Sequence, residues 1–195
     1  MGRALLIGLV VLVAAGCNER AIESWLSEGQ TQGGGPSLYT EDAFARALAE
    51  IRKKIPSPIQ VLSLLVYSDH LVLQAEDPAS KGTALQYVYR AGVVSDGVPV
   101  KLLGTGKLTD NLFPLDAARV SAVPKLTRIA KAKANIPEGT VARVLLKRNL
   151  PESMDIQFRI FVTSQRRDAS FDANQDGTLL EQRTVEPRAP VPTEP

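Results

Sequence analysis

The sequence has 195 residues, of which 44% are hydrophobic, with a formal net charge of +2 and a single cysteine. This length and hydrophobic content allow one domain of ordinary size or two very small ones, and they exclude a chain that is disordered throughout. A single cysteine excludes an intrachain disulfide, so the fold must be stabilised by packing alone.

The first residues have the pattern of a secretion signal. Arg3 precedes an apolar run from Ala4 to Ala15, which is too short to span a bilayer stably. The stretch Leu12–Cys17 (LVAAGC) resembles a bacterial lipobox, in which small residues precede the cysteine that receives a diacylglyceryl group. The lipobox usually has leucine three positions before that cysteine, and Ala14 stands there instead.

We therefore expect a signal peptide over residues 1–16 and lipidation of Cys17, which would anchor the protein to a membrane. The alternatives are an ordinary cleaved signal and an uncleaved anchor, and the position of the only cysteine argues against both. The lipobox resemblance implies a bacterial envelope lipoprotein. Asn18 takes the place where aspartate is the usual inner-membrane retention signal, which favours the outer membrane and a periplasm-facing protein.

A lipidated tether is predicted over residues 17–39, because Gly33–Pro36 cannot hold regular structure. A helix is then expected over 41–55, where apolar residues recur at helical spacing and Pro56 stops the helix. Alternating and β-branched residues predict strands over 60–67, 70–76, 83–94 and 98–103.

The second half of the chain begins with a glycine-rich break at Gly104–Gly106. A helix is predicted over 122–134, with a buried stripe formed by Leu126, Ile129 and Ala130. Further strands are predicted over 140–148, 155–163, 168–172 and 178–182.

The order of one helix and then antiparallel strands thus occurs twice. We predict an α+β fold of two tandem αβββ repeats packed together, at 40–104 and 105–184, since each is too small to bury enough apolar surface alone. A proline-rich disordered tail is predicted over 185–195. This element order resembles PepSY-type domains and the tandem β-lactamase-inhibitor-like fold of small outer-membrane lipoproteins. The resemblance implies binding, often to another protein, in place of catalysis.

Signals for catalysis are poor. His70 is the only histidine, follows a predicted turn and is expected to point into solvent, so a zinc cluster or a Ser-His-Asp set has little to build from. No nucleophile-elbow or phosphate-binding motif is present. The sequence therefore predicts no enzyme activity, no catalytic residue, no metal and no cofactor.

One segment has the beginning of a calcium loop. Asp172, Asn174 and Asp176 alternate before Gly177, as in an EF-hand. However, Arg183 stands where that loop needs a bidentate carboxylate, and the flanking residues have strand patterns. An Asp-Gly hairpin turn explains the same residues and is the preferred interpretation.

Basic residues concentrate in residues 119–167, which hold eleven Lys and Arg and three Asp and Glu. On the predicted helix, Lys125, Arg128 and Lys131 lie away from the apolar stripe. Together they predict a surface for an anionic partner: phospholipid heads, lipopolysaccharide phosphates, cell-wall carboxylates or an acidic protein. The alternative is a solvated face that keeps the protein soluble. The full candidate set adds residues from the strands: Lys125, Arg128, Lys131, Arg143, Lys147, Arg148 and Arg159.

Three functions remain open at this point. The first is a membrane-anchored lipoprotein that binds a protein or an anionic envelope component; the second is a structural lipoprotein without a discrete ligand. The third is an enzyme with an unrecognised site. Binding of nucleic acid is implausible for an exported lipoprotein.

Overall fold

The computed structural model describes residues 35–102 and 106–185, which belong to one compact unit at residues 34–195. The predicted signal peptide, Cys17, Asn18, Gly104 and the tail from residue 186 lie outside the described residues. Among the helices that the structure describes, none combines the length and the apolar character needed to cross a membrane.

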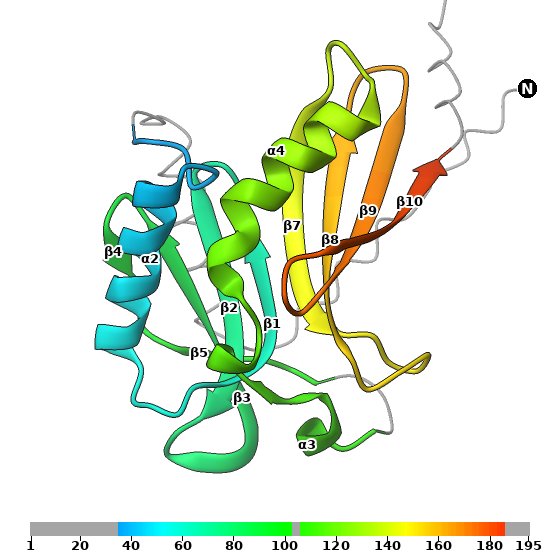
Figure 1. The fold of residues 1–195 in the computed structure, drawn as a ribbon. Coiled ribbons are helices and arrows are strands. Elements are labelled where there is room, and N and C mark those ends of the chain that lie inside the picture. The colour runs from blue at the N-terminus through cyan, green and yellow to red at the C-terminus, as the bar shows by residue number, and fades with distance from the viewer. Residues whose placement is uncertain (1–34, 103–105, 186–195) are drawn as a thin grey trace, which may run out of the picture. The chain divides into compact units, whose positions relative to one another are not determined.

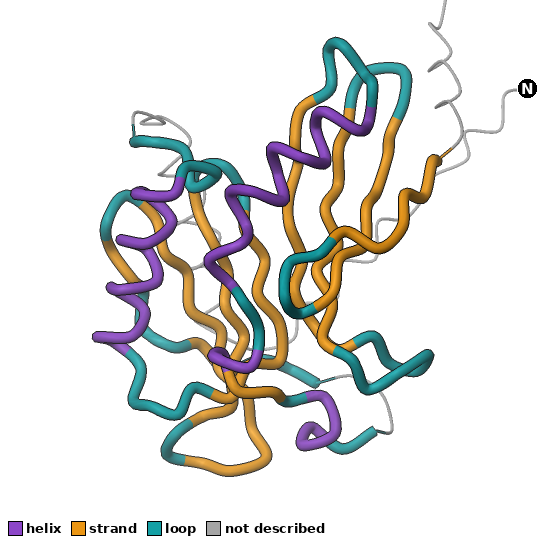
Figure 2. Tube along the Cα trace, in the orientation of Figure 1, coloured by secondary structure: helices purple, strands orange, loops and turns teal. Residues whose placement is uncertain are grey.

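The described strands form one ten-stranded sheet in which every pairing is antiparallel (Figures 1 and 2). Eight of them follow the order β10-β9-β8-β7-β1-β2-β3-β4, while β5 pairs with β3 and β6 pairs with β1. The bounds are β1 Gln60–Val66, β2 His70–Asp77, β3 Ser80–Arg90, β4 Val93–Val94, β5 Val98–Pro99, β6 Phe113–Pro114, β7 Thr140–Arg148, β8 Ile156–Thr163, β9 Asp168–Asn174 and β10 Leu179–Val185. The predicted α+β class with antiparallel strands is confirmed.

Two long helices lie on one face of this sheet (Figure 1). Helix α2 spans Glu41–Lys54 and α4 spans Val123–Ala134, close to the predicted ranges. Each turns an apolar stripe toward the sheet, and amphipathic helices of this kind are held in place mainly by such packing. In α4, Leu126 and Ala130 are fully buried as predicted, while Ile129 is only half-buried and Thr127 is buried in its place.

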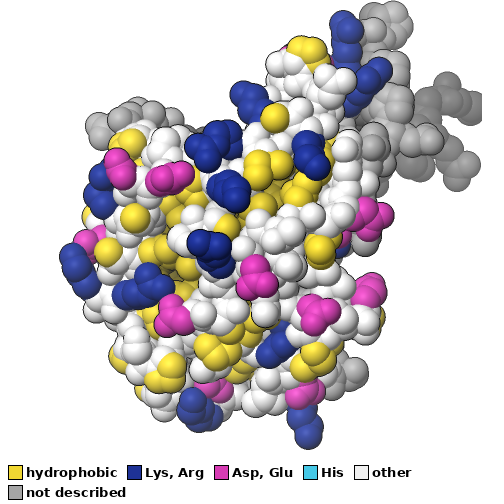
Figure 3. Space-filling model, viewed as in Figure 1, with side chains coloured by type: hydrophobic (Ala, Val, Ile, Leu, Met, Phe, Trp, Pro, Cys, Tyr) yellow, Lys and Arg dark blue, Asp and Glu magenta, His cyan; other side chains and the backbone are white. Residues whose placement is uncertain are grey.

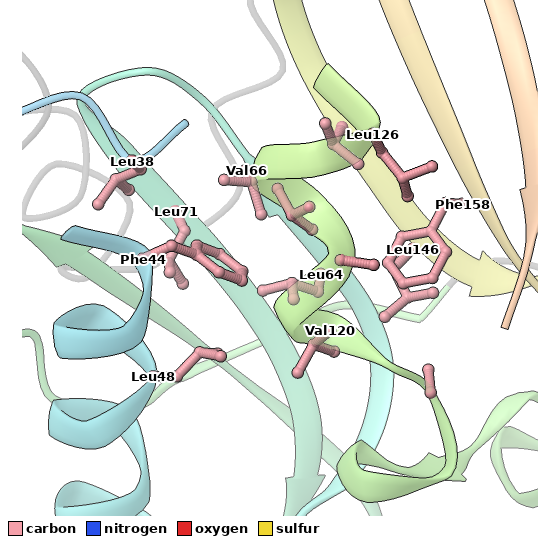
Figure 4. Packing of buried hydrophobic residues seen from close by; sticks show 14 of the residues in the cluster. Leu38, Phe44, Leu48, Leu64, Val66, Leu71, Val120, Leu126, Leu146 and Phe158 are labelled. Carbon is pink, nitrogen blue, oxygen red and sulfur yellow. The ribbon is translucent and has the colours of Figure 1, made fainter. Parts of the chain in front are cut away.

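The core is continuous beneath both helices. Figure 4 shows Phe44 of α2 near Leu71 on one side and Leu146 near Phe158 on the other, with Leu64 of β1 between them. This continuity exists because β1 pairs with β7 along residues 63–66 and 144–147, which joins the strands that follow α2 to those that follow α4. In this sheet α2 is followed by β1 to β5 and α4 by β7 to β10. The interpretation of the chain as two αβββ repeats therefore remains a prediction.

Several boundaries differ from the predicted ones. Residues 83–94 are not one strand, because Ala91 and Gly92 have positive φ and turn the chain between β3 and β4. In the described part of the predicted strand 98–103, β5 pairs with β3 at Val98–Pro99, and the N–H of Val100 donates to the carbonyl of Ala84 at 2.9 Å. The segment before α4 contains structure that the sequence analysis did not predict: α3 Leu108–Asn111, β6, and the short 3-10 turns η2 Leu115–Ala117 and η3 Val120–Ala122.

The predicted tether also ends earlier than expected. Leu38 is buried and its N–H donates to the carbonyl of Ser68 at 2.7 Å. The hydroxyl of Tyr39 donates to the carbonyl of Val66 at 3.4 Å, and burial raises the pKa of Tyr39 well above its ordinary value. Residues 38–39 therefore belong to the folded core.

Candidate functional site

The helix α4 carries the predicted basic surface. Lys125, Arg128 and Lys131 are all exposed, and no acidic residue lies in the first turn of α4. Three residues apart at a rise of 1.5 Å each, their Cα atoms span about 9 Å of the helix axis. Figure 3 shows Lys and Arg side chains gathered over α4 beside hydrophobic atoms. Arg128 lies 3.8 Å from Glu41 of α2, and both side chains are largely exposed, so this ion pair contributes little.

The strand residues of the candidate set do not join that surface. Side chains alternate between the two faces of a strand, and Val144 and Leu146 of β7 are buried on the face that α4 covers. Arg143 and Lys147 therefore point to the opposite face, where their cross-strand neighbours are Phe161 and Gln157. The prediction of one basic cluster is wrong in this respect, because the sheet separates its members.

Two of the predicted anion-binding arginines have structural partners. Arg159 makes two hydrogen bonds to the carboxylate of Asp172, at 2.7 and 3.0 Å, and these bonds raise the pKa of Arg159. Arg148 donates from Nε to the carbonyl of Leu112 at 3.0 Å and from Nη1 to the carbonyl of Met154. Both guanidinium groups thus bind partners within the fold, and we remove Arg148 and Arg159 from the candidate anion-binding set.

Arg143 is different, because its guanidinium carbon lies 4.3 Å from the centre of the Phe161 ring. A cation over an aromatic face gains about 0.5–1 kcal/mol at an exposed site. Arg143 and the exposed Lys147 therefore form a small second basic surface on the face of the sheet opposite α4.

The calcium-loop residues form the preferred hairpin. The carboxylate of Asp172 is taken by Arg159, and the side-chain oxygen of Asn174 accepts the N–H groups of Asp176 and Thr178 at 3.1 and 2.8 Å. Gly177 has φ +76°, and a Cβ there would lie 2.5 Å from the Cβ of Ala122. The Asp-Gly turn therefore lets the β9–β10 hairpin approach the start of α4 closely.

His70 does not point into solvent as predicted. Its ring stacks on Tyr67 with a centroid distance of 4.4 Å, and Nδ1 lies 2.8 Å from Asp69 Oδ1. Burial alone would raise the pKa of Asp69, but hydrogen bonds with His70 and Arg90 lower it below its ordinary value. This cluster closes the β1–β2 turn. Across residues 35–102 and 106–185, no group of three or more His, Cys, Asp or Glu side chains is arranged to hold a metal ion.

A cleft of about 630 Å³ lies at one end of the sheet, and none of the residues that line it was among the predicted site residues. Its walls come from the α2–β1 connection at residues 55–60, from the β2–β3 turn between Glu76 and Gly82, and from Thr109 and Leu112. The usable signal was that Glu76 is buried although it alternates with the half-buried His70 and Gln74, and that Lys81 follows within the same turn. A charged residue at the end of a buried strand is unusual unless it is paired.

No protein-family model and no curated protein matches the sequence. Among solved structures, the fold is similar to that of a putative lipoprotein from Clostridium difficile 630, with a TM-score of 0.51 and 12% sequence identity. The match covers 79% of this chain and 98% of that protein. At this identity the likeness shows a shared fold, and it extends over nearly the whole of the other chain.

Proposed function

We propose that this protein is a lipid-anchored accessory lipoprotein of the bacterial envelope that binds an anionic envelope component without catalysing a reaction. The observation that carries the binding function is the exposed basic face of α4, formed by Lys125, Arg128 and Lys131. Attraction from several exposed cations sums over a charged partner surface, although each single pair is weak. Phospholipid heads and cell-wall carboxylates are partners of the required charge.

The anchoring part of the proposal rests on two observations. The stretch Leu12–Cys17 resembles a lipobox, and the fold is shared with a protein named a putative lipoprotein. Asn18 favours the outer membrane, with the folded unit facing the periplasm. The two αβββ segments are then read as repeats of one binding module, as in the envelope folds that the element order resembles.

Replacing Cys17 by serine is expected to abolish incorporation of a fatty-acid analogue, because serine has no thiol to take the diacylglyceryl group. The measurement is gel fluorescence of the labelled protein in a bacterial host. The variant Ser27→Cys in the Cys17→Ser background is the matched control, since it restores a thiol ten residues away without the preceding small residues. Equal labelling of Cys17→Ser and wild type would show that the anchor lies elsewhere.

Reversing the charges of Lys125, Arg128 and Lys131 to glutamate is expected to weaken binding to vesicles containing anionic phospholipid or to isolated cell wall by about tenfold at low salt. The reason is that the interaction is summed electrostatic attraction, which salt screens over about 10 Å at 0.1 M. The measurement is co-sedimentation of residues 18–195, since an attached lipid would hold the protein to membranes regardless.

The matched control reverses Lys53, Lys101 and Lys107, which are also exposed but do not lie on α4. It changes the net charge equally, so it should bind nearly as well as wild type if position matters. Unchanged binding of the α4 variant, with an unchanged circular dichroism spectrum, would leave this face a solvated surface only.

A further inference from the structure

The cleft at the end of the sheet has the size and lining of a small-molecule site. Its volume of about 630 Å³ falls in the range of about 300–1,000 Å³ that is usual for ligand pockets. Ile55, Pro56, Pro58 and Pro78 supply apolar walls. Proline fixes its own φ, so these walls are preformed and lose little entropy when a ligand binds.

The wall of the cleft that contains Thr109 and Leu112 is also held in place. Leu112 is buried, and its carbonyl accepts the Nε–H of Arg148 at 3.0 Å. The neighbouring connection is fixed by the N–H of Leu115, which donates to the carbonyl of Ile59 at 2.9 Å. The cleft is therefore built from segments that are hydrogen-bonded to the sheet and to one another.

A carboxylate with little exposed surface, that of Glu76, faces this cleft. The side chain of Glu76 is only 8% exposed, and its carboxylate accepts from Lys81 Nζ at 2.8 Å and from the N–H of Gly82 at 3.3 Å. These two hydrogen bonds hold the pKa of Glu76 below its ordinary value, and the bond from Lys81 has the larger effect. Desolvation, which would raise this pKa, has a smaller effect than the hydrogen bonds from Lys81 and Gly82, so the carboxylate stays charged and available to a cationic partner.

The ammonium of Lys81, which pairs with Glu76, is held only weakly. The side chain of Lys81 is 81% exposed, and ion pairs of this kind typically contribute about 0–1 kcal/mol because water competes with the flexible ammonium. Its Nζ therefore occupies a position from which another ammonium could displace it, while Lys81 returns to solvent at little cost.

We propose that this cleft binds a ligand with a protonated primary amine on an apolar body, with Glu76 as the anchor for the ammonium and Lys81 as the group it displaces. The apolar walls take the body of the ligand. Two sources share this chemistry, a small alkyl amine and the free amino terminus of an apolar peptide. This site lies apart from the basic surface of α4 and does not depend on the anionic partner proposed above.

The test is isothermal titration calorimetry with the full chain in detergent micelles and leucinamide as the probe. Saturable binding is expected for leucinamide and not for N-acetyl-leucinamide, which has the same apolar body but no charge. Absence of saturable heat with leucinamide up to concentrations on the order of 10 mM, where even weak complexes form, would overturn the proposal. Equal binding of the acetylated compound would overturn it as well.

Two variants are expected to act in opposite directions. Glu76→Gln should weaken leucinamide binding by about tenfold, since the amide oxygen of glutamine can accept a hydrogen bond from the ammonium but carries no negative charge. Lys81→Met should strengthen it by up to about fivefold, because the competing ammonium is removed. Glu138→Gln, at an exposed carboxylate in the turn after α4, is the matched control and should change nothing.

The direction of the Lys81→Met effect separates ligand binding from a purely structural role of the ion pair. Weaker binding by Lys81→Met, or unchanged binding by a folded Glu76→Gln, would show that the cleft does not recognise the amine in this way. The peptide Leu-Pro-Leu-amide distinguishes the two sources: tighter binding than leucinamide assigns the site to a peptide amino terminus, and equal binding assigns it to a small amine.

Discussion

Replacing Phe158 by alanine is expected to lower the free energy of unfolding by about 3–5 kcal/mol, the usual cost of deleting a fully buried ring. Phe158 lies on β8 with no exposed surface, in the core shared with Leu126 of α4 and Leu146 of β7 (Figure 4). Chemical denaturation monitored by circular dichroism measures the loss. A melting temperature lower by about 10 °C should accompany it in a chain of this length.

Phe161→Ala is the matched control, because it removes the same ring from the same strand on the opposite face. Phe161 is half-buried and its ring contacts the guanidinium of Arg143. We expect a loss of only about 1 kcal/mol there. If both variants lost equal stability, the face of the sheet opposite α4 would have to be as tightly packed at Phe161 as the face under α4 is at Phe158.

Replacing Arg159 by leucine is expected to cost about 2 kcal/mol of stability, although the sequence analysis assigned this residue to anion binding. Asp172 has a side chain only 5% exposed, and the change removes its bidentate guanidinium partner. Removing one member of a buried pair typically costs about 3–5 kcal/mol. The 32% exposure of the Arg159 side chain lets solvent screen the pair, which reduces the figure.

The double variant Arg159→Leu with Asp172→Leu should lose less stability than the sum of the two single variants, because no buried charge is then left behind. Arg143→Leu is the control, because Arg143 is a basic residue on the same face whose cross-strand neighbour on β8 is Phe161. It should cost less than about 1 kcal/mol. Additive losses in the double variant would contradict a coupled pair.

The spacing of apolar residues along the sequence was sufficient to predict the two long helices and the main strands. Phe44, Leu48 and Ile51 recur at helical spacing and are buried in α2, since one stripe of a helix must face the core. Ile156, Phe158 and Ile160 alternate with half-buried residues in β8, as expected for a sheet with one covered face. These features depend on residues near in sequence, so periodicity reveals them.

Boundaries within irregular segments were harder to predict, for a physical reason. The break at Ala91–Gly92 depends on two successive residues with positive φ, and only glycine makes that conformation inexpensive. Short elements such as β6 exist because β1 is available as a partner. A two-residue strand has no periodicity of its own, so nothing in its sequence predicts it.

The sequence by itself determined the α+β class, the two amphipathic helices and the hairpin at Asp176–Gly177, because each follows from periodicity or turn chemistry within a few residues. Only the tertiary structure decided that β1 pairs with β7. The face of β7 that packs under α4 was likewise decided by tertiary contacts, and it leaves Lys125 and Lys147 on opposite sides of the sheet. The tertiary structure also decided that Arg159 binds Asp172 and that Glu76 faces a cleft. These outcomes depend on contacts between residues distant in the chain, and the charge of a side chain does not reveal which partner the fold will bring to it.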